Sequence, residues 1–171
     1  MSQSNRLLKL VKATSKFPKG VRSTLWSKAF GRIVPMVGTA NIRYLEVDVN
    51  HVTVRLENQK NMQNHIKGVH AAAMALLAET ATGFLTGLHI PDNRILLIKS
   101  LHVDYLKVVE GGLTATATLS IEQQKYIADH EKGELVIPVT VIDDAGNEPI
   151  QCQMLWAWLP KPVSYTHLRA H

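Results

Sequence analysis

Residues 64–88, NHIKGVHAAAMALLAETATGFLTGL, contain a long run of apolar and small side chains. From Val69 to Leu88 these side chains occupy nearly every face of a helical wheel, so we expect a helix over about 68–88 that is buried all round. Glu79 is the only acidic residue in this run. Burial of an unpaired carboxylate is costly and raises its pKa, so Glu79 is a candidate either for internal pairing or for chemistry.

Segments with a period of two flank this helix on both sides. Two strands joined around Asn50-His51 precede it, and four strands follow it. The predicted strands cover about 45–49, 52–56, 94–109, 113–121, 135–142 and 149–159. One buried helix between separate groups of strands favours an α+β fold, with an antiparallel sheet wrapped around the helix, over a doubly wound sheet.

The first 35 residues favour two helices, and the second helix is expected from about Val21 to Ile33. Residues 6–32 carry eight basic side chains and no acidic one. This segment is interpreted either as a solvated helix face or as a surface for anionic lipid or nucleic acid.

No linker or repeat divides the chain, so a single domain is predicted over 1–162. Residues 163–171 break the pattern and are predicted to be a disordered or artificially appended tail.

The composition restricts the class of protein. With 46% apolar and 19% charged residues the chain is globular, and no apolar run is long enough for a transmembrane helix. Without a secretory signal, and with Cys152 as the only cysteine, a cytoplasmic protein is expected. Cys152 is interpreted as a packing residue. The eight histidines show no zinc-protease spacing and no Gly-x-Ser-x-Gly elbow occurs, so neither a metal site nor another cofactor is predicted.

The start of the predicted helix offers a second chemical element. Amides just after His70 have no acceptor within the helix, and Ala71 and Ala72 are small enough to let a ligand approach them. Such amides can stabilise an oxyanion that develops on a carbonyl group. His70 and Glu79 are nine residues apart and are expected on opposite helix faces, which disfavours a direct dyad within one chain.

The order Asn64, His70, Glu79 resembles that of hotdog-fold thioesterases of the phenylacetic-acid and 4-hydroxybenzoyl-CoA type. Those enzymes carry an Asn, a His-Gly-Gly-like turn and an acidic residue within the helix. Asn64-His65, followed by Val69-His70-Ala71 and Glu79, is more closely similar to the DUF4442 branch of that superfamily. The resemblance covers about residues 20–160 and implies a hotdog fold.

The resemblance also implies an activity, hydrolysis of acyl-CoA or another thioester. Glu79 would be the general base or nucleophile, and the Ala71 amide would polarise the carbonyl group. Asn64 would position water or the carbonyl, and His70 would shape the turn. His65, Gly68 and Ala72 would line the substrate site. The basic N-terminal residues could then attract the phosphates of coenzyme A.

Sites of this family lie between two subunits, so the resemblance implies a homodimer, or a tetramer built from it. The segment 99–104 of a second copy would contribute to the site, with Ser100 as the candidate residue. One departure is that Ala71 and Ala72 stand where two glycines are expected. Two alternatives therefore remain: a non-catalytic module that binds acyl chains or lipids, and an interaction protein that uses its basic N-terminal helices. Nucleic acid is not the expected partner.

Overall fold

A computed structural model describes residues 5–162 of the chain. The N-terminal part contains three helices, two strands and a short 3-10 turn: α1 (Arg6–Thr14), α2 (Lys19–Ile33), α3 (Pro35–Thr39), β1 (Arg43–Val47), β2 (His51–Leu56) and η1 (Lys60–Met62). The remainder contains the long helix α4 (Ala71–Gly87), the short helix α5 (Ile121–Asp129) and five strands: β3 (Arg94–Tyr105), β4 (Leu113–Thr118), β5 (Gly133–Ile137), β6 (Val139–Asp143) and β7 (Ile150–Pro160). The predicted tail, 163–171, lies outside the described residues.

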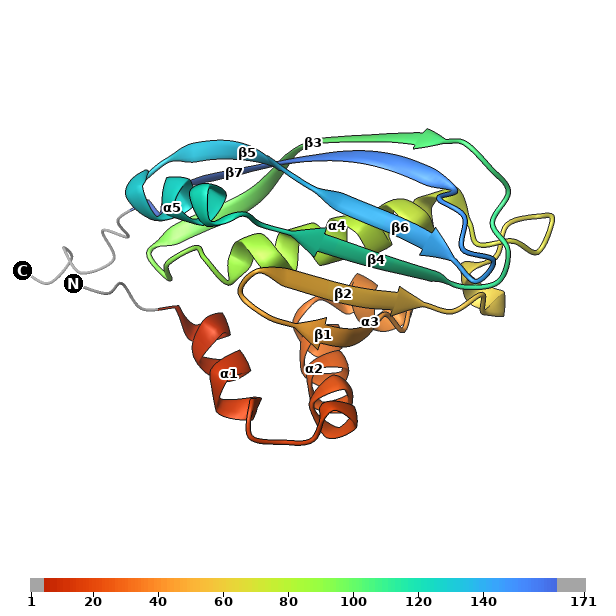
Figure 1. Cartoon of the computed structure of the whole chain (residues 1–171), viewed down its shortest axis with the longest axis horizontal. Coiled ribbons are helices and arrows are strands. Elements are labelled where there is room, and N and C mark those ends of the chain that lie inside the picture. The colour runs from red at the N-terminus through yellow and green to blue at the C-terminus, as the bar shows by residue number, and fades with distance from the viewer. Residues whose placement is uncertain (1–4, 163–171) are drawn as a thin grey trace, which may run out of the picture.

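The strands form two antiparallel sheets that curve around α4 (Figure 1). One sheet has the order β1-β2-β4-β6 and the other the order β3-β7-β5. β5 and β6 follow each other directly, separated only by Pro138, and so carry the chain from one sheet into the other. The inner face of α4 is fully buried at Leu77, Ala78, Ala81 and Leu85. The predicted α+β class, a long central helix packed against antiparallel sheet, is confirmed.

Three predicted strands differ from the observed ones. The strand predicted over 135–142 is two strands, because Pro138 has no N–H and interrupts the ladder. The strand predicted over 113–121 ends at Thr118, and Ile121 instead begins α5. Ser120 and Gln123 form a capping box at the start of α5, a signal that the alternation of apolar residues concealed. The strand predicted over 94–109 ends at Tyr105.

The threonines of α4 explain how a buried helix tolerates polar side chains. The hydroxyl groups of Thr80, Thr82 and Thr86 donate to the carbonyl groups four residues earlier, at 2.7–2.9 Å. The indole N–H of Trp156 donates in turn to the Thr82 hydroxyl at 2.9 Å. These hydrogen bonds leave none of the three hydroxyls unsatisfied, so α4 can be enclosed by the sheets and α3 without a large desolvation cost.

Hydrogen bonds join the N-terminal helices to the end of α4 and to each other. The Asn5 side chain accepts a hydrogen bond from Leu8 N–H and so caps α1, while its amide group donates to the carbonyls of Gly87, Leu88 and Ile90. Asn5 therefore joins the start of α1 to the end of α4. At the other end of α1, the Thr14 hydroxyl accepts a hydrogen bond from the Trp26 indole at 2.8 Å. Among residues 5–162, no helix is long and apolar enough to cross a membrane.

Candidate active site

The loop before α4 is organised by Asn64. Its side-chain oxygen accepts hydrogen bonds from Ile66 N–H at 3.0 Å and from Gly68 N–H at 3.1 Å. The Gly68 carbonyl accepts a further bond from the Asn64 backbone N–H at 2.8 Å. Asn64 and Gly68, both predicted site residues, are thus half-buried parts of one turn that presents the start of α4. His65 lies at the exposed outside of the same turn.

His70 is the N-cap of α4, and its ring fixes the nearest amides. Its Nδ1 accepts a hydrogen bond from Ala72 N–H at 3.1 Å, so in this arrangement the neutral ring carries its proton on Nε2. The Ala71 N–H, by contrast, donates to no group within the described chain. The predicted roles of Ala71 and Ala72 therefore separate: only the Ala71 amide is left as a donor for a ligand.

A cavity of about 250 Å³ opens beside this helix start. We call it the N-terminal cavity. Its lining consists of Met36, Thr39, Ala40, Asn61, Met62, Gln63, His70, Ala72, Ala73 and Leu76. Most of these side chains are apolar, and Thr39, Asn61, Gln63 and His70 add polar groups, so the cavity can accept a short apolar segment that carries a polar group.

Glu79 lines a different cavity, of about 280 Å³, which we call the carboxylate cavity. The other residues around it are Leu7, Phe30, Ile33, Val34, Val37, Tyr44, Thr80, Gly83, Phe84, Leu96 and Trp156. No basic residue belongs to this lining, and the Glu79 carboxylate makes no hydrogen bond or ion pair among residues 5–162. Glu79 is thus a half-buried acid among aromatic and aliphatic side chains.

Burial has electrostatic consequences in this cavity. Removal of water around the carboxylate raises the pKa of Glu79 above its ordinary value. Tyr44, buried beside it, has its phenol pKa raised well above the usual range, first by desolvation and then by the negative charge of Glu79. The rings of Phe30, Tyr44 and Phe84 pack within 5.1 Å of one another, centre to centre, and form a rigid apolar wall. A carboxyl group with a raised pKa in an apolar cleft is a stronger base than an ordinary glutamate, which makes Glu79 a candidate for proton transfer.

The two cavities follow each other along α4. Leu76 borders the first and Glu79 the second, and α3 contributes Met36 to the first and Val37 to the second. Ala71 and Glu79 are eight residues apart, which places them about 12 Å apart along the helix axis. This distance exceeds what one carbonyl group spans between a donor on its oxygen and a base near its carbon. Within one chain, the Ala71 N–H and the Glu79 carboxylate therefore cannot act on the same carbonyl group.

Ser100 lies away from both cavities. It pairs with Leu155 of β7, whereas the neighbours of Leu155, Met154 and Trp156, are buried against α4. Because directly opposed residues share a face, Ser100 points to the outer surface of the sheet. On the inner side of β3, Tyr105 donates its hydroxyl to the Ala71 carbonyl at 3.0 Å, a contact that was not predicted.

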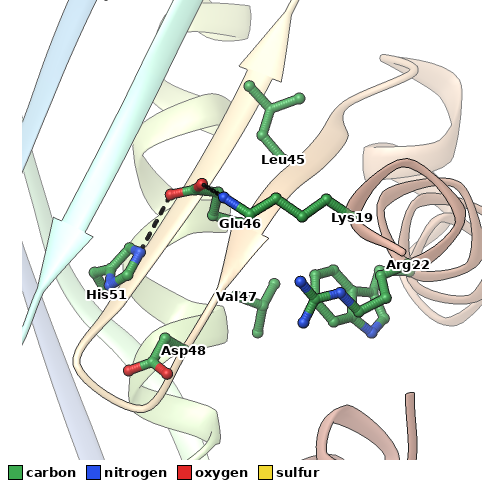
Figure 2. Close-up of a pocket in the computed structure, with 8 residues that line it drawn as sticks. Lys19, Arg22, Leu45, Glu46, Val47, Asp48 and His51 are labelled. Atoms are coloured by element: carbon green, nitrogen blue, oxygen red, sulfur yellow. Dashed lines mark hydrogen bonds and ion pairs between the residues drawn. The ribbon is translucent and has the colours of Figure 1, made fainter. Parts of the chain in front are cut away.

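A third pocket, of about 330 Å³, lies between α2 and the β1–β2 hairpin (Figure 2). Glu46 accepts a hydrogen bond from Lys19 at 3.3 Å and lies 3.4 Å from the His51 ring. Arg22 stacks over Trp26 with its guanidinium carbon 5.6 Å from the ring centre. None of the predicted site residues lines this pocket, and its basic side chains are accompanied by Glu46 and Asp48, so it carries little net charge.

Several residues of the carboxylate cavity were not predicted. Tyr44 and Phe30 come from segments that precede α4 by more than 25 positions, and only the fold brings them to Glu79. Trp156 comes from the last strand, and its indole N–H reaches Thr82 of α4. Within residues 5–162 no group of three or more His, Cys, Asp or Glu side chains is placed to hold a metal ion.

Solved structures with the same architecture identify the fold class. A protein of unknown function from Pseudomonas aeruginosa, described as a thioesterase candidate, matches with a TM-score of 0.71 at 18% identity, over 81% of this chain and 95% of that chain. A thioesterase from Haemophilus influenzae matches with a TM-score of 0.65 at 13% identity, over 90% of this chain and 98% of that chain. The fold is therefore the hotdog fold, as predicted.

The family is shown by the sequence itself. Residues 22–159 match the model of a family described as a domain of unknown function, DUF4442, and the chain belongs to this family. The predicted membership is confirmed. No protein with a curated description shows significant similarity to the chain. Helix α1 precedes the matched residues, so the Leu7 contribution to the carboxylate cavity comes from outside the family domain.

Proposed function

We propose that the chain hydrolyses acyl thioesters, with Glu79 as the reacting carboxylate. The observation that carries this proposal is the place of Glu79: an acid without a cationic partner in the described chain, in an apolar cavity that raises its pKa. The carboxylate removes a proton from water as the water oxygen bonds to the thioester carbonyl carbon. The carbon–sulfur bond then breaks, and the thiolate takes the proton from Glu79. The products are a carboxylic acid and a thiol.

The start of α4 supplies the second part of the mechanism. The Ala71 N–H, at the positive end of the helix dipole, donates to the carbonyl oxygen as negative charge develops there. His70 and Asn64 are positioning residues in this proposal: the ring holds the Ala72 amide and Asn64 holds the preceding turn. Gly68 acts through the same turn, and exposed His65 is available to the carrier portion of the substrate.

A second copy of the chain is needed to bring these parts together. Because Ala71 and Glu79 are about 12 Å apart along one helix, we propose that each site combines the helix start of one subunit with Glu79 of the other. β3 is an edge strand of its sheet, and Leu97, Ile98, Leu101 and Tyr105 on it are 38–52% exposed. Pairing of two β3 edges would cover these side chains and bring the two α4 helices side by side. A role for Ser100 and a tetramer remain predictions.

The lining of the carboxylate cavity indicates the acyl group. Apart from Glu79 and Thr80 it is apolar or aromatic, and Tyr44 is deeply buried. An unbranched aliphatic or small aromatic acyl group fits this chemistry better than a charged one, because a charged group would be desolvated without a partner.

A non-catalytic acyl-binding module is the second candidate. It is favoured by the Ala72 N–H, which is already bonded to His70 and so leaves one amide, rather than two, at the helix start. Such a module would use the same cavities without turning over its ligand.

The test compares wild type with Glu79→Gln on a series of acyl-CoA substrates of increasing chain length, with release of the free thiol as the readout. We expect turnover by wild type and a loss of about 10²–10⁴-fold in kcat for the variant. Because Glu79→Gln keeps the size of the side chain, we expect the variant to fold normally. Thermal unfolding curves of both proteins check this. Absence of turnover on every substrate, together with a fatty acid that copurifies, would select the non-catalytic module.

A further inference from the structure

The two N-terminal helices form a hairpin that projects from the body of the molecule. In Figure 1, α1 and α2 extend below the sheets, and the loop that joins them is the part farthest from β3, β5 and β7. Leu7 and Val11 of α1 face inward, where Leu7 lines the carboxylate cavity and Val11 is buried. The rest of α1, the loop and the exposed side of α2 contact solvent.

Large apolar side chains are exposed along this hairpin. Leu10 is 41% exposed, Phe17 48%, Val21 47% and Leu25 42%. Val21 and Leu25 are one helical turn apart on α2, and Phe17 lies in the loop. Single exposed apolar residues are common, but four within residues 10–25 indicate a partner that can cover them.

The charge of the same hairpin identifies the partner. Lys12, Lys16, Lys28 and Arg32 are exposed among these apolar residues. The first acidic residue of the chain is Glu46, which lies beyond α2. A second copy of the hairpin is an unfavourable partner because like charges would meet. Basic side chains interleaved with large apolar ones match an anionic bilayer surface, where the former meet headgroups and the latter enter the acyl boundary.

We propose that the outer side of the α1–α2 hairpin docks on the surface of an anionic lipid bilayer. A nucleic acid would satisfy the basic side chains but would leave Leu10, Phe17, Val21 and Leu25 exposed. The proposal does not depend on hydrolysis, because binding can be measured with no substrate present.

Vesicle flotation tests the proposal with the full chain. Vesicles of phosphatidylcholine alone are compared with an equimolar mixture of phosphatidylcholine and phosphatidylglycerol, at about 0.1 M and about 1 M salt, where the Debye length falls from about 10 Å to about 3 Å. We expect binding to the mixed vesicles that is at least about tenfold tighter than to neutral ones and that weakens at high salt. Equal binding to both vesicles, or no binding to either, would overturn the proposal.

Two double variants separate the electrostatic and apolar contributions. Lys12→Gln with Lys16→Gln should weaken binding roughly 25-fold at low salt, about fivefold for each lysine. Leu10→Ser with Phe17→Ser should weaken binding about tenfold or more at both salt concentrations. The matched controls are Lys125→Gln with Lys132→Gln, and Ile121→Ser, which are exposed at or beside α5. Controls that weaken binding as much as the hairpin variants would contradict the assignment, as would a short DNA duplex that displaces wild type from the vesicles.

A label at the loop gives an independent readout that does not rely on loss of binding. Burial and the nearby Asp104 raise the pKa of the Cys152 thiol to about 11, so Cys152 reacts slowly at neutral pH. Phe17→Cys can therefore be labelled selectively with a fluorophore that reports polarity. A blue shift with mixed vesicles is expected. An unchanged spectrum, while the labelled protein floats with the vesicles, would show that another surface binds.

Discussion

The two ends of the α4 site are built by opposite means. The start of α4, beside the N-terminal cavity, is organised by a polar loop, in which Asn64, Gly68 and His70 make hydrogen bonds of 2.8–3.1 Å. The carboxylate cavity is made by packing, in which aromatic rings surround Glu79 and no hydrogen bond holds its carboxylate in the described chain. One region orients a donor, and the other raises the pKa of an acid.

This difference indicates how one helix can serve a two-part reaction. A donor works best when it is fixed before the charge develops, which the loop achieves through its hydrogen bonds. A carboxylate is a stronger base when its pKa is raised, and the apolar wall raises the pKa of Glu79 through desolvation. Two different segments of α4 meet these two requirements, and the proposed dimer brings one segment from each subunit to the same substrate.

After the Glu79 substitution, the largest effect is expected from removing the Ala71 N–H. Ala71→Pro places proline at the first position of α4, where proline is tolerated and where His70 already has an extended backbone. We expect kcat for thioester hydrolysis to fall about 10²–10³-fold with little change in Tm. Ala71→Ser, which retains the N–H, is the control. Full activity in the proline variant would show that the helix start does not act on the carbonyl.

The next effect concerns the packed wall of the carboxylate cavity. A Cβ atom at Gly83 would lie 2.5 Å from Trp156 Cζ2, so Gly83→Ala must displace the ring that donates to Thr82. We expect a loss of about 1–3 kcal/mol in the free energy of unfolding, measured in urea. Gly87→Ala on the same helix meets the ends of two flexible side chains, Leu7 at 3.3 Å and Leu96 at 4.0 Å, and should be neutral or stabilising. Equal losses for both variants would argue against a rigid wall.

Substitutions at the start of α4 should change the free energy of unfolding less than Gly83→Ala does. His70→Ala removes the acceptor for Ala72 N–H and should lower the free energy of unfolding by about 1 kcal/mol, as for other N-caps. His65→Ala, an exposed neighbour in the same loop, should change it by less than about 0.5 kcal/mol. If the two variants unfold at the same urea concentration, the His70 cap does not stabilise α4.

The smallest effect is a pH dependence of stability. Because the pKa of Glu79 is raised in the folded chain, the folded state binds this proton more tightly than the unfolded state. The charged form therefore lowers stability as the pH rises from the ordinary glutamate pKa of about 4.3 through the raised pKa of the folded chain. Glu79→Gln should be more stable than wild type at pH 8, with no such gain near pH 4. Urea unfolding at both pH values measures the difference, and a variant less stable at pH 8 would contradict the desolvation.

Sequence patterns identified the parts of the fold that depend on local periodicity. The apolar run of α4 and the alternation in β2, β4 and β7 follow directly from residue spacing. Pro138 marks a strand break and the Ser120 capping box marks the start of a helix, and both are visible in the sequence. Both lie in segments whose alternation of apolar residues favoured continuous strands. The Asn5 contacts to Gly87, Leu88 and Ile90 join positions more than 80 residues apart, and no local pattern indicates them.

In the candidate site, too, local features could be predicted from the sequence and tertiary contacts could not. Glu79 and the helix start were identified because an acid in an apolar helix and free N-terminal amides are local features. The walls contributed by Phe30, Tyr44 and Leu96 depend on tertiary packing. The use of the Ala72 amide by His70 depends on a ring rotamer, which spacing alone does not specify.

Complementation between two inactive variants tests the central claim most directly. Ala71→Pro and Glu79→Gln chains, carrying different tags, are coexpressed, and dimers that contain both are purified and assayed for thioester hydrolysis. If each site uses Ala71 of one subunit and Glu79 of the other, one of the two sites in a mixed dimer is intact, and about half of wild-type activity should return. Mixed dimers as inactive as the parent variants would contradict a shared site and would place both groups within one chain.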